Sequence, residues 1–225
     1  MTGRAQPANI VFLIAEHDNF DAGEIAQIRD AIGATVTSCY AALASLSPTL
    51  NITVFPGDYP GAGIITDYGV GGFAANANWM RIAIDRSGAP SFDRIVNEFL
   101  PATVLHEVHH CARIRAFGAP ETAQDAAISE GLATAFERDM LGSQPPWGDY
   151  SAIPADAWAD EILALENPYA HRDWFFTHPD GRRWIGYRAG TYLVDCAMKS
   201  SGKSAAQLAD VPTKTILADA NAAQA

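Results

Sequence analysis

Two histidines and two glutamates near the middle of the chain have the spacing of a metal-dependent hydrolytic site. His106 and His110 lie four residues apart in an H-E-x-x-H motif, and Glu107 directly follows the first histidine. On a helix, side chains four residues apart share one face, so both imidazoles can bind a single Zn²⁺ ion. Glu107 is then placed to take a proton from a metal-bound water without binding the metal itself. A catalytic zinc needs a third protein ligand, and Glu130, twenty residues after His110, is the predicted one.

The segments around these residues favour two consecutive helices. Pro101 can begin the first helix, because its fixed φ suits the first helical position, and a Gly-Ala-Pro sequence at residues 118–120 ends it. The second helix is predicted over about residues 122–140 and carries Glu130 in its middle. Small residues flank Glu130, which lets two helices approach closely. A carboxylate in such surroundings is costly to bury unless it is paired or bound to metal.

Alternatives for the histidines stay open at this point. His106 and His110 could be a solvated or buried imidazole pair without a metal, since an H-E-x-x-H motif also arises by chance. His109 lies three residues after His106 on the same helix edge, and we expect it to support a ligand instead of binding the metal. Cys111 points about 100° away from His110 around the helix and is predicted to belong to the core.

Three motifs resemble those of a known protease family. They are H-E-x-H-H, the sequence S-E-G-L-A at residues 129–133, and W-x-G-Y-x-x-G-x-Y at residues 184–192. All three are similar to motifs of a bacterial family described as predicted zinc-dependent proteases, over about residues 95–218. The second is also similar to the E-G-x-A run of M1-type aminopeptidases, which belong to the gluzincin clan of zinc metallopeptidases. The resemblance implies one Zn²⁺ ion, a minimal thermolysin-like zincin fold and a glutamate as third ligand, here Glu130. Thermolysin-type enzymes also carry an acidic residue four positions later, where this chain has Thr134, so that supporting role stays unassigned.

The resemblance also implies a hydrogen-bond donor for the negative charge that develops on the substrate oxygen. M1-type aminopeptidases use a tyrosine some tens of residues after the third ligand, and Tyr187 has a comparable position. One positioned donor of this kind contributes about 3 kcal/mol to transition-state stabilisation. His171 and His178 are rival donors, although both lie in polar stretches typical of exposed loops or helix ends. The alternative is that Tyr187 is a packed tyrosine with a structural role.

A short stretch before residue 80 is interpreted as a substrate-binding edge strand, by analogy with gluzincins. In that clan an extended substrate pairs with an edge strand above the zinc helix through main-chain hydrogen bonds. Residues 76–79 read Asn-Ala-Asn-Trp, and Asn76, Asn78 and Trp79 are the predicted substrate-binding residues. The alternative is an ordinary hairpin whose glycine-rich part is a loop.

The order of predicted elements indicates an α+β fold. One strand, one helix and further strands come first and only helices follow, so we expect a small mixed N-terminal sheet packed on the active-site helix. A chain of 225 residues suits a single domain, predicted as a sheet lobe over residues 1–90 and a helical lobe over residues 91–225. The expected strands are 9–15, 51–55, 64–68 and 79–85, the expected early helix is 21–45, and 69–75 is expected to be a flexible segment.

Composition argues against several kinds of partner. The formal net charge is −11, from 26 acidic and 15 basic residues, which argues against binding a nucleic-acid backbone. No apolar run approaches the roughly 18–20 residues that span a bilayer. The three cysteines lie far apart, so we expect no disulfide framework and a cytoplasmic location, or a secreted or periplasmic one if a leader was removed. The sequence does not indicate the oligomeric state.

The chemistry predicted from these residues is zinc-dependent hydrolysis of a peptide or protein substrate. The G-x-M-E-N motif with which M1-type enzymes hold a free amino terminus is absent, which slightly favours an endopeptidase or a narrow peptide hydrolase and leaves the choice between endo- and exopeptidase open. Two other classes stay open: a non-catalytic zinc-binding module with a regulatory or interaction role, and a metal-dependent hydrolase of a non-peptide amide. Glu107 argues against the first, because a purely structural zinc site has no use for a base beside an open metal position.

Overall fold

The computed structural model describes residues 9–12, 19–58, 62–88, 90–142 and 145–223. The chain forms two compact units, Met1–Arg115 and Ala116–Ala225, here called the sheet unit and the helical unit. The division falls in the last turn of α3 (Leu100–Phe117), which carries the H-E-x-x-H motif. The predicted α+β class is confirmed, because a small mixed sheet comes first and the remainder is mostly helical.

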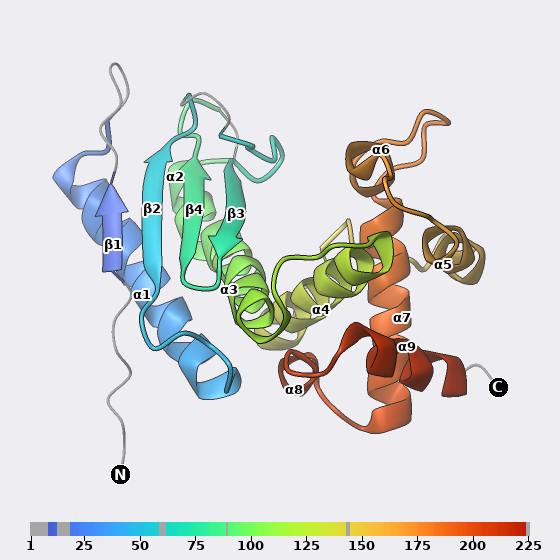
Figure 1. Ribbon diagram of the computed structural model, residues 1–225. Coiled ribbons are helices and arrows are strands. Elements are labelled where there is room, and N and C mark those ends of the chain that lie inside the picture. The colour runs from blue at the N-terminus through green and yellow to red at the C-terminus, as the bar shows by residue number, and fades with distance from the viewer. Residues whose placement is uncertain (1–8, 13–18, 59–61, 89, 143–144, 224–225) are drawn as a thin grey trace, which may run out of the picture. The chain divides into compact units, whose positions relative to one another are not determined.

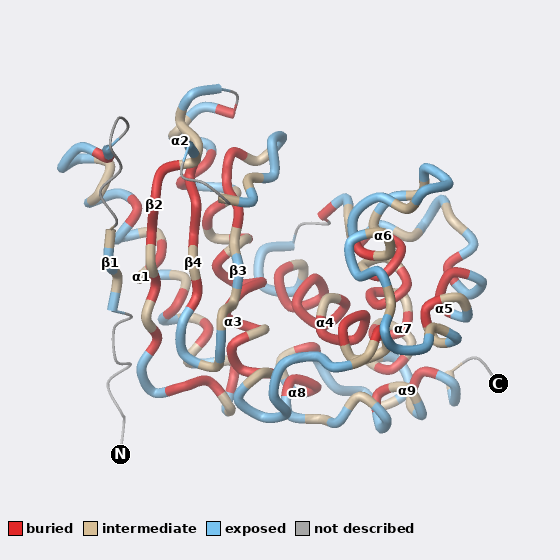
Figure 2. The backbone as a smooth tube through the Cα atoms, turned by 45° about the horizontal axis from the view of Figure 1, so that its top comes forward, coloured by how far each residue is buried: buried red, intermediate tan, exposed pale blue. Residues whose placement is uncertain are grey.

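The sheet has four strands in the order β1-β2-β4-β3 (Figure 1). β1 (Asn9–Phe12), β2 (Asn51–Pro56) and β4 (Trp79–Ile84) run parallel to one another, whereas β3 (Val70–Asn76) is antiparallel to β4 and forms one edge. Alternate side chains of the two inner strands are fully buried, because one face of the sheet packs against helices (Figure 2). These side chains are Ile52, Val54, Met80, Ile82 and Ile84.

Two long helices belong to the sheet unit, and in Figure 1 both lie behind the sheet. α1 (Ala22–Ala42) begins at Asp21, whose side chain accepts backbone hydrogen bonds while the Glu24 side chain accepts one from the Asp21 N–H. α3 follows without a break from α2 (Phe92–Arg94) and a five-residue π-helical turn, η1 (Ile95–Phe99). The helical run therefore starts before Pro101, which lies inside it.

The edge strand β3 overturns two sequence predictions. A strand was expected at residues 64–68 and a flexible segment at 69–75, and both expectations are wrong: within the described chain, 64–68 contributes one isolated bridge at Ile65, and β3 takes up most of 69–75. Glycine is depleted in strands, but close packing requires it here. A Cβ at Gly72 would lie 2.5 Å from Cγ of Glu107, so the strand can cross the helix only where a side chain is missing.

The other predicted elements are found with small shifts at their ends. The strands at 51–55 and 79–85 are confirmed, and the early helix ends at Ala42 instead of residue 45. The strand at 9–15 is confirmed as far as Phe12, and residues 13–15 lie outside the described residues. The described part of the chain holds no helix long and apolar enough to cross a membrane. All three cysteines are free.

α7 (Ile185–Ser201) is the central helix of the helical unit (Figure 1). It contacts α4 (Ala123–Leu141), α5 (Ala155–Leu163), α6 (His171–Phe175), α8 (Ala205–Leu208) and α9 (Thr213–Ala222). α4 and α7 touch through their backbones: a Cβ at Gly131 would lie 2.3 Å from the carbonyl carbon of Gly190, and one at Gly190 would lie 2.0 Å from the carbonyl oxygen of Ala127. The small residues beside Glu130 thus allow the close helix approach that the sequence predicted.

Candidate metal centre

α3 holds the two motif histidines close together on one side. The ring centroids of His106 and His110 are 4.8 Å apart and the rings are nearly perpendicular, at 77°. His106 is only 8% exposed, and His110 is partly exposed. Apolar side chains of the same helix, Val104, Leu105 and Val108, are buried and fix α3 in the core of the sheet unit. The helical spacing therefore places the imidazoles side by side, as the motif predicted.

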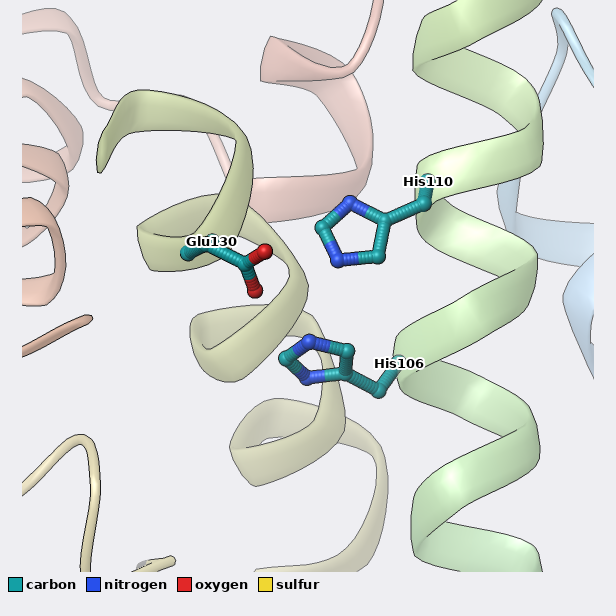
Figure 3. A group of neighbouring side chains, drawn as sticks. All are labelled: His106, His110 and Glu130. Atoms are coloured by element: carbon teal, nitrogen blue, oxygen red, sulfur yellow. The ribbon is translucent and has the colours of Figure 1, made fainter. Parts of the chain in front are cut away.

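Glu130 completes a group of three potential metal donors. The group consists of His106, His110 and Glu130, and their ligand atoms all lie within 4.8 Å of one another (Figure 3). Two imidazoles and one carboxylate are the donor types of a catalytic zinc site, which keeps its fourth position open. These residues therefore fit a zinc ion both by their chemistry and by their proximity.

Glu107 is held against the edge strand β3 within the sheet unit. The backbone N–H of Ala74 donates a 2.7 Å hydrogen bond to Oε2 of Glu107, whose residue is only 8% exposed. Gly72 makes this approach possible, because a Cβ there would lie 2.5 Å from Cγ and 2.7 Å from Oε1 of the glutamate. The strand thus fixes one oxygen of the carboxylate that follows the first motif histidine.

The segment 76–79 is not the edge strand that the sequence analysis assumed. Asn76 is the last residue of β3, and Trp79 is the first residue of β4, an inner strand paired on both sides. The Asn76 side chain accepts a 2.9 Å hydrogen bond from the N–H of Asn78, and the Trp79 indole donates one of 3.0 Å to Thr53. These side chains shape the turn between β3 and β4, because the edge strand spans Val70–Asn76 and ends where the predicted segment begins. A substrate-binding role for them stays a prediction.

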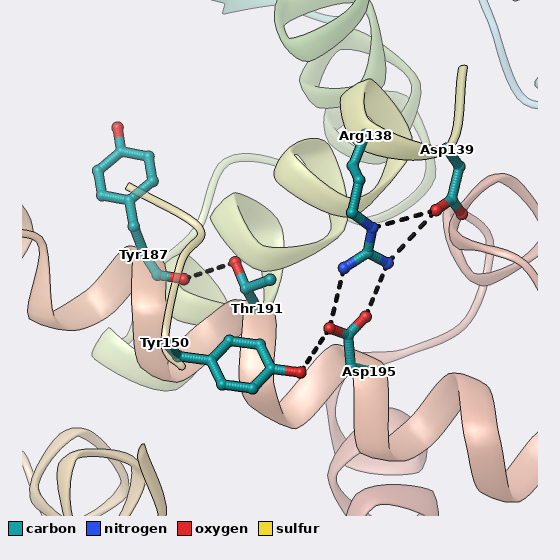
Figure 4. A network of polar contacts seen from close by, with 6 residues as sticks. All are labelled: Arg138, Asp139, Tyr150, Tyr187, Thr191 and Asp195. Carbon is teal, nitrogen blue, oxygen red and sulfur yellow. Dashed lines mark hydrogen bonds and ion pairs between the residues drawn. The ribbon is translucent and has the colours of Figure 1, made fainter. Parts of the chain in front are cut away.

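Tyr187 lies in the first turn of α7, and its role as an oxyanion donor stays a prediction. Its ring meets Phe175 edge-on at a centroid distance of 5.9 Å. In Figure 4 its hydroxyl points away from the network in which Asp195 accepts hydrogen bonds from Arg138 at 2.8 and 2.9 Å and from Tyr150 at 2.8 Å. The phenol is therefore not part of the Asp195 network.

Of the two rival histidines, His171 is the one near Glu130. His178 lies 2.9 Å from a carboxylate oxygen of Asp180, its neighbour in a tight turn. His171 begins α6, and its ring stacks on Phe175 at 4.3 Å and 11°. Although the residue as a whole is exposed, this packing lowers the pKa of His171, and the charge of Glu130 opposes the shift.

Tyr169 is a neighbour of Glu130 that sequence reasoning missed. Its hydroxyl lies 3.2 Å from Nδ1 of His171. Burial raises the pKa of the Tyr169 phenol, and the charges of Asp125 and Glu130 raise it further. The residue lies in a loop between α5 and α6, where no helical or strand periodicity marks it. The Tyr169 hydroxyl and the His171 imidazole are therefore a second candidate source of a hydrogen bond near Glu130, besides Tyr187.

One family comparison bears on this centre. A protein-family model with the description "Predicted Zn-dependent protease (DUF2268)" matches residues 28–218, which include all three candidate ligands and Glu107. The chain belongs to this family. No curated protein and no solved structure matched the chain. The description of the predicted Zn-dependent protease family agrees with the donor set of His106, His110 and Glu130.

Proposed function

We propose that this member of the predicted Zn-dependent protease family hydrolyses peptide bonds, with Glu107 as the general base. The observation that carries the proposal is the 2.7 Å hydrogen bond from the Ala74 N–H to Glu107. It joins three parts that peptide hydrolysis needs: a carboxylate, the helix of two metal-binding histidines, and an edge strand. A site that only stabilises the fold would not need the first and third of these.

His106, His110 and Glu130 are the residues that would hold the zinc. The ion, when bound, supplies Lewis-acid activation of water and of the substrate carbonyl. The chain contributes the donor set, and the backbone contact of Gly131 with α7 fixes the helix on which Glu130 lies. This arrangement is of the gluzincin type, in which a third-ligand glutamate lies on a second helix.

Glu107 moves the protons. It accepts a proton from the attacking water and later gives it to the leaving amine, as a general base and then a general acid. The hydrogen bond from the Ala74 N–H fixes the orientation of this carboxylate. Glu107 is only 8% exposed, so it is largely shielded from bulk water. Tyr187, or the pair Tyr169 and His171, donates a hydrogen bond to the developing oxyanion.

β3 is the surface on which a peptide would bind. From residue 72 to residue 76 its outer edge pairs with no other described strand. Apart from the Ala74 N–H, which donates to Glu107, such an edge offers main-chain hydrogen bonds to an extended peptide, which binds as an additional strand. Glu107 contacts this same stretch of β3. A peptide that pairs with β3 would therefore bring its scissile bond close to the general base.

The first test measures zinc and hydrolysis together. We expect about one zinc per chain by elemental analysis, lost in His110→Ala, and cleavage of a fluorogenic peptide library that Glu107→Gln abolishes while keeping its zinc. Glu98→Gln is the matched control, because Glu98 is exposed and paired with Arg94 on the same helical run. Wild-type cleavage by Glu107→Gln would refute the mechanism, and a wild-type chain that binds no zinc would refute the centre.

A further inference from the structure

Two arginines flank one tryptophan at the start of α7. The guanidinium carbon of Arg183 lies 4.2 Å from the centre of the Trp184 ring, and that of Arg188 lies 5.4 Å from it. Trp147 meets the same indole edge-on at 6.5 Å. Stacking of this kind holds a guanidinium in place while its N–H groups stay available along its edge. Arg183 and Arg188, here called the arginine pair, are thus held near each other.

Within the described chain neither member of the arginine pair forms an ion pair with a carboxylate, although Asp149 lies near enough to act on the charge of Arg188. Arg188 donates one long hydrogen bond of 3.4 Å to the carbonyl oxygen of Pro146, and its buried Nε has no partner there. Burial lowers the pKa of Arg188 and the charge of Arg183 lowers it further, against the opposing effect of Asp149. Asp149 itself accepts its hydrogen bonds from Ser151, at 2.7 and 2.9 Å.

Neighbouring arginines of the same unit are paired. Arg182, next to Arg183 in sequence, binds Glu161 and Asp180 at 2.8 Å, and Arg138 binds Asp195 at 2.8 Å. Acidic residues outnumber basic ones by 26 to 15 in this chain, so internal partners are plentiful. Arg183 and Arg188 are adjacent cations without an ion-pair partner in the described chain. They form a local positive site that an anion would complete.

The arginine pair lies at the start of α7, the helix that packs against the helix of Glu130. Arg188 is two residues before Gly190, whose backbone touches α4 at Ala127 and Gly131. The loop that carries Pro146 also reaches α4, since a Cβ at Gly148 would lie 2.3 Å from the side chain of Thr134, one turn after Glu130.

We propose that the arginine pair binds a carboxylate of the peptide substrate, a few residues from the bond that is cut. This inference rests on the proposed function and gives it a substrate class: peptides that carry either a free C-terminal carboxylate or an acidic side chain at that position. Guanidinium groups bind carboxylates through two parallel hydrogen bonds, which adds geometric selectivity to charge. The indole of Trp184 provides the apolar wall against which the bound segment packs.

The test compares peptides that differ in one charge. Zinc-loaded Glu107→Gln is titrated calorimetrically with acetylated hexapeptides that end in a carboxylate or an amide, and with amide-ended peptides that carry Glu or Gln at successive positions. We expect the charged member of at least one pair to bind roughly tenfold more tightly, as a charge-assisted contact predicts. The two sets tell a C-terminal carboxylate from an acidic side chain.

Substitutions then assign the preference to the arginine pair. Arg183→Gln and Arg188→Gln should each reduce the preference to within about threefold, and Arg188→Lys should restore part of it because it keeps the charge. Lys199→Gln is the control, since it removes the same charge from α7 some 16 Å further along the helix. Thermal unfolding checks that each variant is folded.

The outcomes separate this inference from the proposed function. A charge preference that disappears with the arginine pair supports the carboxylate site, even if the wild-type enzyme cleaves no peptide and the proposed function fails. Equal binding of charged and neutral peptides, or a preference that survives both arginine substitutions, overturns the site. Cleavage by the wild type without any charge preference would then leave the proposed function standing alone.

Discussion

Substituting Gly72 by alanine tests whether β3 holds the general base. The new Cβ would lie 2.5 Å from Cγ of Glu107 and 2.7 Å from both Oε1 and the Cγ2 of Thr103, about 0.7 to 0.9 Å inside an ordinary 3.4 Å contact. Strand and helix backbone cannot absorb this overlap locally, so the Glu107 side chain has to rotate away. Rotation breaks the 2.7 Å hydrogen bond from the Ala74 N–H. A hydrogen bond to a charged group contributes about 1.5–3 kcal/mol, so kcat should fall roughly 10- to 100-fold.

The assay measures kcat and KM on the best library peptide, with zinc content and thermal unfolding measured on the same preparations. Gly72→Ala should keep its zinc, because the substitution touches neither His106 nor His110. Gly33→Ala is the matched control: a Cβ there meets nothing within 4 Å, and alanine in a helix interior stabilises by up to about 1 kcal/mol. Wild-type kcat in folded, zinc-loaded Gly72→Ala would show that the position of Glu107 under β3 does not control catalysis.

Three further substitutions test other parts of the structure. Glu130→Ala should lower zinc content far below one per chain, and full occupancy by elemental analysis would place the third ligand elsewhere. Tyr187→Phe should lower kcat by up to about 100-fold with little change in KM, because it removes only the hydroxyl; unchanged kinetics would make the tyrosine structural. Asp195→Ala removes the acceptor shared by Arg138 and Tyr150 and should lower the free energy of unfolding by about 2–4 kcal/mol in chemical denaturation. A loss below about 0.5 kcal/mol would mean that this network does not hold α4 to α7.

The two histidines of the candidate metal centre were predictable because their spacing is a local property. His106 and His110 share a helix face by counting residues, and neither needs a distant contact to be recognised. Glu130 was found by a different signal, a carboxylate among small residues on the next helix, and the structure brings its ligand atoms within 4.8 Å of the histidines. Here the sequence pattern and the packing point to the same residues.

The edge strand was predicted at the wrong place because its signal is not local. A run such as Gly71-Gly72 reads as a loop by strand propensity, and only the proximity of Glu107, far along the chain, explains why glycine is needed there. Tyr169 was not predicted as a neighbour of Glu130, for a related reason. It lies in a loop without periodicity, and its closeness to Glu130 arises from how α4 and the loop before α6 pack.

The crossing of α4 and α7 has a consequence for how this centre tolerates change. Where Gly131 meets Gly190, main chain lies directly on main chain, and no side chain between them can change rotamer to absorb a defect. A single added methyl at either glycine would displace one whole helix relative to the other, and Glu130 would travel with its helix. We therefore expect Gly131→Ala or Gly190→Ala to lower zinc content, although neither substitution alters a candidate donor. Gly131 and Gly190 carry only a hydrogen atom as side chain, so any substitution at either position adds volume to this contact.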